Sequence, residues 1–140
     1  MGVRVRQDSP AWSPRADKFA YITLNSIFAQ AVETGEIEGL LGAPAISRSF
    51  RHPDFSPDGR LLVYSFWNGK TDWNIWAVSL ADDRQPFPLV QAPGVQDDPK
   101  VSPDGQWLAY HTRESGRSEV RVRALRAGSV TWQLSTEGGT

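Results

Sequence analysis

The sequence predicts an all-β chain built from three repeated units of four antiparallel strands each. Its main marker is the tetrapeptide SPDG, which stands at 56–59 and again at 102–105. Short runs rich in Val, Ile, Trp, Phe and Tyr surround both copies, as is typical of all-β structure. No segment of helical length shows apolar residues at the spacing of an amphipathic helix.

A third, divergent copy of the marker lies near the N-terminus. SPRADKFAY at 13–21 aligns with SPDGRLLVY at 56–64 and SPDGQWLAY at 102–110. In each copy a Tyr falls eight residues after the Ser, an apolar residue precedes the Ser, and a Pro stands three residues before it. The first copy has Arg15 and Ala16 where the others have Asp and Gly, so its sequence does not by itself predict the same turn geometry.

The SPDG residues favour a tight turn between the first and second strands of a unit. Pro sets φ near −65°, Asp bonds nearby backbone N–H groups, and Gly supplies positive φ. Metal binding by Asp58 and Asp104 is the alternative. One carboxylate per unit lacks the dense oxygen spacing of a calcium loop, so we favour the turn.

Each unit is expected to continue with a loop, a third strand, a turn and a fourth strand. The third strands are predicted at 26–32, 74–80 and 119–125, and the fourth at 37–41, 87–90 and 130–135. The repeated Tyr residues are predicted to end the second strands and to pack between neighbouring units. They are Tyr21, Tyr64 and Tyr110.

A four-stranded repeat of roughly 40–45 residues is typical of a β-propeller blade. We therefore expect one domain, 1–140, with blade units at about 9–50, 51–96 and 97–140. The alternating run VRVR at 3–6 has no place in the first unit. Residues 1–8 are either a ring-closing strand or a frayed tail.

The repeat resembles that of the TolB-type, WD-like propeller family. The segments HPDFSPDGRLLVYSFWNGKTDWNIWAVSL and DDPKVSPDGQWLAYHTRESGRSEVRVRAL carry this resemblance, which extends over nearly all of 9–140. The third unit also resembles propellers of bacterial proteins with a kinase domain. The family resemblance implies six blades and a role as an interaction or sensor module.

Three blades are too few to close a ring, because propellers need about 4–8. An open stack would leave two sheet faces uncovered, and exposed apolar patches mark interfaces or aggregation sites. We expect this chain to be half of a six-bladed ring. Two copies would complete the ring by two-fold symmetry, or further blades of a longer parent chain would do so.

The composition of the chain argues against several classes of binding partner. The net charge of −1 and the pI near 6.1 do not favour nucleic acid or an anionic membrane. No apolar stretch reaches membrane-spanning length, and the absence of Cys excludes disulfides. The N-terminus has no secretory h-region, so the chain as given is expected in the cytoplasm, or in the periplasm if its parent is TolB-like.

No catalytic motif is present, so we expect neither an enzyme nor a cofactor or metal site. The two histidines, His52 and His111, stand outside any metal-binding pattern, and nucleophile-elbow and phosphate-loop motifs are missing. The predicted function is a non-catalytic scaffold that binds a protein or peptide. The alternative is a piece of a larger enzyme: a prolyl-oligopeptidase-like peptidase, a bacterial protein kinase or a polysaccharide lyase.

Binding is expected on one rim, in the loops before the first strand and between the second and third strands. These loops carry aromatic and arginine side chains, the usual hot-spot types, together with acidic residues. Alternatively, the Trp residues only cap the blade and the Asp residues only bond backbone groups. The candidate residues are His52, Asp54, Trp67, Trp73, Asp97, Asp98, Lys100, Arg113 and Arg117.

Overall fold

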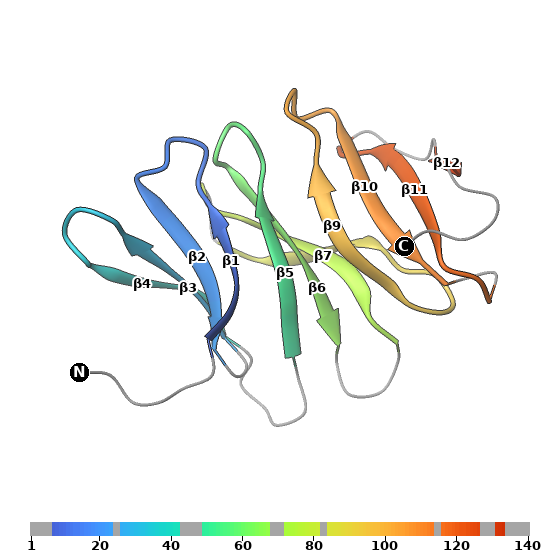
Figure 1. Cartoon of the computed structure of the whole chain (residues 1–140), viewed down its shortest axis with the longest axis horizontal. Helices are drawn as coiled ribbons and strands as arrows, with labels where there is room; N and C mark the ends of the chain where they lie inside the picture. The colour runs from blue at the N-terminus through green and yellow to red at the C-terminus, as the bar shows by residue number, and fades with distance from the viewer. Residues whose placement is uncertain are drawn as a thin grey trace.

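The computed structural model describes residues 7–23, 26–42, 49–67, 72–81, 84–113, 116–126 and 131–133. Within these residues it contains twelve strands and no helix, and the strands form three antiparallel sheets of four (Figure 1). The predicted all-β class and the three four-stranded units are therefore confirmed. The expected strand at 3–6, inside segment 1–8, lies outside the described residues.

Each sheet takes its four strands in chain order. The first sheet consists of β1 (Gln7–Trp12), β2 (Lys18–Thr23), β3 (Ser26–Ala31) and β4 (Ile37–Gly42). The second consists of β5 (Ser49–Phe55), β6 (Leu61–Trp67), β7 (Asn74–Ser79) and β8 (Pro86–Val90). The third consists of β9 (Gln96–Val101), β10 (Trp107–Thr112), β11 (Glu119–Ala124) and β12 (Thr131–Gln133).

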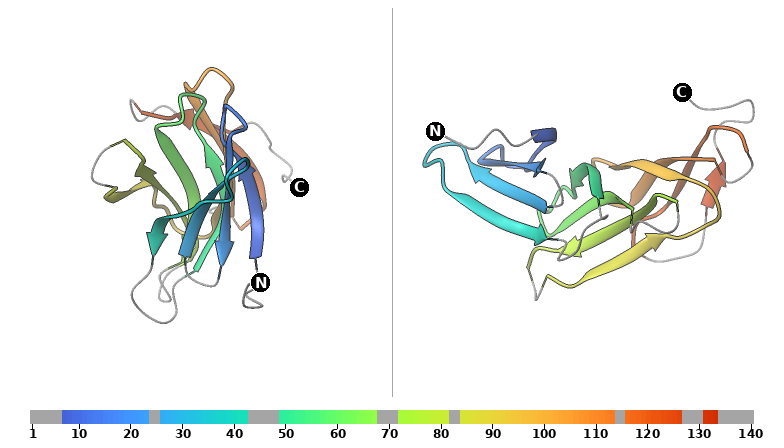
Figure 2. Two further views of the ribbon diagram at one scale, coloured as in Figure 1. Left: turned by 90° about the vertical axis from the view of Figure 1, so that its left-hand side faces the viewer. Right: turned by 90° about the horizontal axis from the view of Figure 1, so that it is seen from below.

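The sheets stack face to face in the manner of propeller blades (Figures 1 and 2). Their first strands, β1, β5 and β9, contact one another in that order and form the shared inner edge of the stack. The remaining strands of each sheet lead outward from that edge. The second sheet is therefore covered on both faces.

Two apolar clusters hold the stack together. One lies between the first and second sheets and includes Ala20, Ile27 and Tyr64. The other lies between the second and third sheets and includes Val63 and Tyr110. The predicted packing of the repeated Tyr between blades is thus confirmed for Tyr64 and Tyr110. The prediction that each Tyr ends its second strand is wrong, because the second strands continue two or three residues past it.

The SPDG residues form the turn between the first two strands of the second and third sheets. In the second sheet, Ser56 Oγ donates to Asp58 Oδ1 at 2.6 Å and accepts from the backbone N–H of Leu61 at 3.0 Å. This hydrogen bond, together with the N–H of Arg60, lowers the pKa of Asp58 to about 2. The carboxylate is therefore part of the turn.

The first turn keeps the same backbone hydrogen bonds as the two SPDG turns, which answers the question that its sequence left open. Ala16 N–H donates to Ser13 O at 2.9 Å, as Gly59 N–H does to Ser56 O at 2.9 Å. Ala16 adopts the left-handed φ of 57° that a Gly takes elsewhere. Asp17, two positions later than the SPDG Asp, accepts from Ser13 Oγ at 2.7 Å. These side-chain bonds allow a sequence without Gly to adopt the turn.

Replacing Ala16 with Gly is predicted to stabilise the protein. A left-handed Ala costs about 1–2 kcal/mol. Gly escapes that cost but gains unfolded-state entropy, which offsets about 0.4–1 kcal/mol of it. We expect Ala16→Gly to raise the free energy of unfolding by about 0.5–1 kcal/mol, measured by urea titration.

The matched control is Gly59→Ala in the second turn. Gly59 has φ of 73°, and an added Cβ would meet no atom within 4 Å, so the substitution adds backbone strain alone. The αL strain of about 1–2 kcal/mol is partly offset by the lower unfolded-state entropy of Ala, so we expect it to lower the free energy of unfolding by about 0.5–1 kcal/mol. A shift of the same sign in both variants would contradict the shared turn geometry.

Candidate functional site

The predicted entry-loop residues lie inside the inner strands, not in loops before them. His52 and Asp54 belong to β5, and Asp97, Asp98 and Lys100 belong to β9. His52 and Asp98 each precede a Pro and have φ of 53°. The strand registers shift beside them, so each inner strand carries a bulge and then continues. Charged residues beside a Pro resemble a loop in sequence, which explains the error.

Asp97 is the centre of a polar cluster that joins the second and third sheets. Its Oδ1 accepts from Arg51 Nε at 3.0 Å and from Ser65 Oγ at 2.7 Å, and lies 3.1 Å from His52 Nδ1. Its Oδ2 accepts from Arg51 Nη2. Asp97 comes from β9, whereas its three partners come from β5 and β6, so the cluster fastens one blade to the next.

The cluster changes the acidity of its members. Burial alone would raise the pKa of Asp97, but hydrogen bonds from His52, Ser65 and Arg51 outweigh burial and hold that pKa well below its usual range. The hydrogen bond to Asp97 raises the pKa of His52, against the opposing effect of burial. The folded protein therefore favours an ionised Asp97 beside a protonated His52.

The geometry argues against hydrolytic chemistry in this cluster. In a serine hydrolase the Ser hydroxyl bonds His and the Asp orients that His. Here Ser65 donates to Asp97, and His52 contacts the same carboxylate oxygen. Asp97 Oδ1 also accepts from the backbone N–H of Asp98 at 2.8 Å, so it has little capacity left as a base.

Two Trp side chains cover the cluster on the same end of the second sheet. The Arg51 guanidinium carbon lies 3.7 Å from the centre of the Trp73 ring. Trp73 stacks in turn on Trp67, with ring centres 6.4 Å apart and 28° between the planes. Asp97 thus holds Arg51, and Arg51 orients Trp73, which produces an ordered aromatic and cationic platform.

Gln96 builds the neighbouring wall. Its side chain is fully buried, and its Oε1 accepts from Asn74 Nδ2 at 2.7 Å. Its Nε2 donates to Pro93 O at 3.1 Å. These bonds fasten the segment between β8 and β9 across the start of β7.

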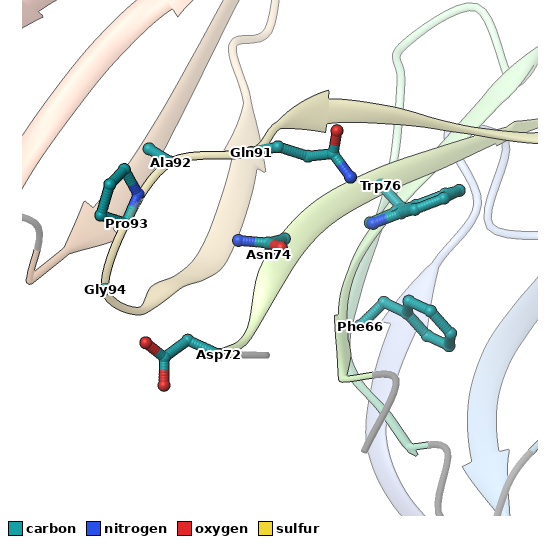
Figure 3. Close-up of a pocket in the computed structure, with 8 residues that line it drawn as sticks. All are labelled: Phe66, Asp72, Asn74, Trp76, Gln91, Ala92, Pro93 and Gly94. Atoms are coloured by element: carbon teal, nitrogen blue, oxygen red, sulfur yellow. The ribbon is translucent and has the colours of Figure 1, made fainter. Parts of the chain in front are cut away.

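A pocket of about 420 Å³ lies between that segment and the second sheet (Figure 3). It combines two aromatic side chains, two amides, a carboxylate and a tight backbone turn. Its lining residues are Phe66, Asp72, Asn74, Trp76, Gln91, Ala92, Pro93 and Gly94. A mixed apolar and polar hollow of this size is the usual form of a small binding site.

The other candidate residues are more dispersed. Asp54 accepts from the Val101 N–H at 2.8 Å, and burial raises its pKa, so it links two inner strands. Lys100 Nζ lies 3.9 Å from Asp98 Oδ1. Arg113 and Arg117 are exposed beyond the end of β10.

The structure thus brings together His52, Asp97, Trp67 and Trp73 from the predicted set, and it adds three residues that sequence reasoning missed. Arg51 and Gln96 flank predicted residues, and Ser65 is a polar residue within the apolar strand LLVYSFW. That interruption was the available signal for Ser65. In the described ranges no group of three or more His, Asp or Glu is placed to hold a metal ion. Those ranges also contain no helix long and apolar enough to cross a membrane.

Comparison with known proteins finds similarity to TolB over part of the chain. No family model matches the chain. The Tol-Pal system protein TolB of Escherichia fergusonii is 43% identical over 53 residues, which are 38% of this chain and 12% of that protein.

Solved structures agree with this similarity. TolB from Acinetobacter baumannii superposes with a TM-score of 0.82 at 25% identity, over 99% of this chain and 34% of that one. The β-propeller domain of the Trilobed protease from Pyrococcus furiosus has a TM-score of 0.70 at 12% identity, over 94% and 43% respectively, and shows the fold alone. The chain spans about one third of the solved TolB and a smaller share of the curated relative.

The His52–Asp97 pair predicts a pH-dependent stability. Because folding raises the pKa of His52, its stabilising contribution is fully present below the unfolded value near 6.5. That contribution is lost as the pH rises through the folded-state pKa. We expect the free energy of unfolding, relative to that of His52→Gln, to fall as the pH rises from about 6.5 through the folded-state pKa, in parallel urea titrations.

Asp97→Asn supplies the control for that experiment. Without the carboxylate, His52 loses the partner that raises its pKa, so the His52→Gln difference should become nearly independent of pH. An unchanged pH profile in Asp97→Asn would show that His52 titrates without help from Asp97.

Proposed function

We propose that this chain, a partial β-propeller with TolB-type repeats, is a non-catalytic scaffold that binds a protein or peptide. The proposed site is the end of the second sheet that carries Trp67, Trp73 and Arg51, together with the adjoining pocket. The observation that carries the proposal is the Arg51–Trp73–Trp67 stack, held in place by Asp97.

Preorganisation supports binding at this platform. Trp and Arg are the residue types that dominate binding energy at interfaces. Arg51 is fixed by two hydrogen bonds to Asp97, and Trp73 lies between Arg51 and Trp67. A partner would therefore meet side chains whose conformational freedom is already restricted, which lowers the entropy cost of association.

The neighbouring pocket fits a peptide. The Gln91 amide can both donate and accept hydrogen bonds, as a peptide backbone requires, and the Asn74 carbonyl oxygen adds an acceptor, because Asn74 Nδ2 already donates to Gln96 Oε1 and Trp73 O. Phe66 and Trp76 supply apolar surface for a side chain, with ring centres 5.5 Å apart. Gln96 fixes the wall that contains Gly94 and Pro93, so the hollow is formed before a ligand arrives.

The non-catalytic part of the proposal rests on the hydrogen bonds of the polar cluster. Ser65 and His52 both bond the Asp97 carboxylate and are not arranged as nucleophile and base. The curated relative reported above is a Tol-Pal system protein, and this similarity supports a non-catalytic role.

We also propose that the predicted blade units, 9–50, 51–96 and 97–140, form one domain that is incomplete without further blades. A second copy of the chain or additional blades of a longer parent would supply them. The fact that the chain covers about one third of a solved TolB supports the need for more blades.

Loss of the platform should weaken peptide binding. A random-peptide phage library panned on the immobilised protein supplies the probe, and calorimetry measures the selected peptide. We expect Trp73→Ala to weaken that peptide's affinity by about 30-fold, since hot-spot truncation costs about 2 kcal/mol. Trp67→Ala should have a smaller effect, because Trp67 is the outer member of the stack: it packs on Trp73, which in turn packs on Arg51.

Phe87→Ala is the matched control, because Phe87 is an exposed aromatic residue of β8 outside the platform and the pocket. The Phe87→Ala variant should bind the selected peptide with the same affinity as the unsubstituted protein. All variants should give the same circular dichroism spectrum. Equal affinity of Trp73→Ala and the unsubstituted protein for every selected peptide would rule out the platform.

A further inference from the structure

The two buried interfaces of the stack follow one rule: a face with bulky side chains packs on a face with smaller ones. The second sheet turns a chain of aromatic rings toward the first, in which Tyr64, Phe50, Phe66 and Trp76 contact one another in that order, with ring centres 5.2–5.5 Å apart. The first sheet opposes them with smaller side chains. These are Ala20, Ile22, Ile27 and Ala29.

The first sheet carries a second chain of aromatic rings on its opposite face. Trp12, Phe19, Tyr21 and Phe28 follow one another with ring centres 5.8–6.1 Å apart. Cross-strand pairs place Tyr21 opposite Phe28 and Trp12 opposite Phe19, so all four share one face. No described sheet covers that face.

Equivalent positions show how much of this face is left open. Counted from the turn Ser, Trp12 corresponds to Phe55; Trp12 is 62% exposed, whereas Phe55, covered by the first sheet, is 6% exposed. The first residue after the third strand is Val32 in the first sheet and Leu125 in the third. Val32 is 51% exposed and Leu125 is 1% exposed. The open face therefore has the residues of a blade interface without its cover.

The third sheet has the complementary open face. Ala109 pairs with Val122, and Trp107 pairs with Ala124, so these side chains share one face. The positions that correspond to Ala109 and Val122 in the second sheet are Val63 and Ala77, which are both fully buried. In the third sheet both residues are only partly buried.

A hollow marks the place on this face where a partner residue would sit. Between the second and third sheets, Leu125 lines a pocket of about 570 Å³ together with Arg60, Leu61 and Ser79. The matching residues of the third sheet, Gln106, Trp107 and Ala124, line a pocket of about 320 Å³ on its open face. In a second copy, Val32 holds the position that matches Leu125. The repeat would therefore place the Val32 side chain at this pocket.

We infer that the aromatic face of the first sheet docks on the open face of the third sheet of a second copy, and that two such contacts close a six-bladed ring. The contact continues the interface pattern already present twice within the chain. It places Trp12 and Val32 of each copy against Ala109 and the pocket beside Trp107 of the other.

The number of copies follows from the blade count. The described residues of one copy form three sheets, and propellers close with about 4–8 blades. Two copies give a count inside that range, whereas one copy falls below it and three copies exceed it. A head-to-tail contact that closes makes a ring, and one that does not close makes an open filament.

This inference deepens the proposed ring completion but is tested apart from the binding platform. The test is the solution mass, measured by sedimentation at micromolar concentration. The unsubstituted protein is expected at twice the chain mass of 15.5 kDa. Trp73→Ala should have this same mass, so loss of ligand binding and loss of ring closure are distinguishable.

Two variants address the two faces separately. Trp12→Glu places a charge on the aromatic face, and Ala109→Arg places a long charged side chain on the smaller-residue face. Each is expected to reduce the mass to that of one chain while retaining the circular dichroism spectrum of the unsubstituted protein. Mixing the two variants should restore some paired species, because one of the two contacts is then intact.

Ile37→Glu is the matched control. Ile37 is 60% exposed, close to the 62% of Trp12. It corresponds to Pro86 in the second sheet, which stays exposed although its sheet is covered on both faces. This variant should therefore keep twice the chain mass.

Three results would overturn the inference. A single-chain mass of the folded, unsubstituted protein would show that a second copy does not cover these faces and would favour blades of a parent chain. An Ala109→Arg variant that stays paired while Trp12→Glu does not would show that the aromatic faces pack on each other. Masses that increase without limit at higher concentration would indicate an open filament.

Discussion

The packing of a bulky face on a smaller-residue face is the constraint on which the rest of this structure depends. A β-sheet that is apolar on both sides requires cover on both sides, and β6 shows the result, because Leu61 through Ser65 are all buried. In the first and second sheets the repeat supplies aromatic groups on one face and smaller groups on the other, so these two sheets stack in one direction. This directional stacking aligns the inner strands and leaves two unlike faces at the ends.

Polar contacts take over where the apolar packing ends, at the inner edge. Asp97 binds Arg51, His52 and Ser65 across the joint between two sheets, and Asp54 binds the inner strand of the next sheet. These hydrogen bonds join residues that are about one repeat apart in the sequence. They form because the stacked sheets bring those residues together. The order of the Arg51–Trp73 platform thus depends on the same packing as the core, which couples the proposed binding end to blade assembly.

The sequence was sufficient for the blades but not for the inner edge. SPDG, the following Tyr and the apolar strands are local signals, and they located the sheets and the buried positions of Tyr64 and Tyr110. The inner strands instead contain Pro and charged residues, which locally resemble loops, and their bulges at His52 and Asp98 are visible only in backbone geometry. Arg51, Ser65 and Gln96 were missed because their partners lie in other strands, up to 46 residues away.

Hydrogen exchange at two protein concentrations tests the packing rule most directly, because it reports protection strand by strand. The amides of β6, covered on both faces, should exchange most slowly at every concentration, as expected for the middle unit of a repeat stack. The amides of β2 and β11 should be less protected at low concentration and gain protection as a second copy covers their open faces. Protection of β2 and β11 equal to that of β6 and independent of concentration would contradict the account.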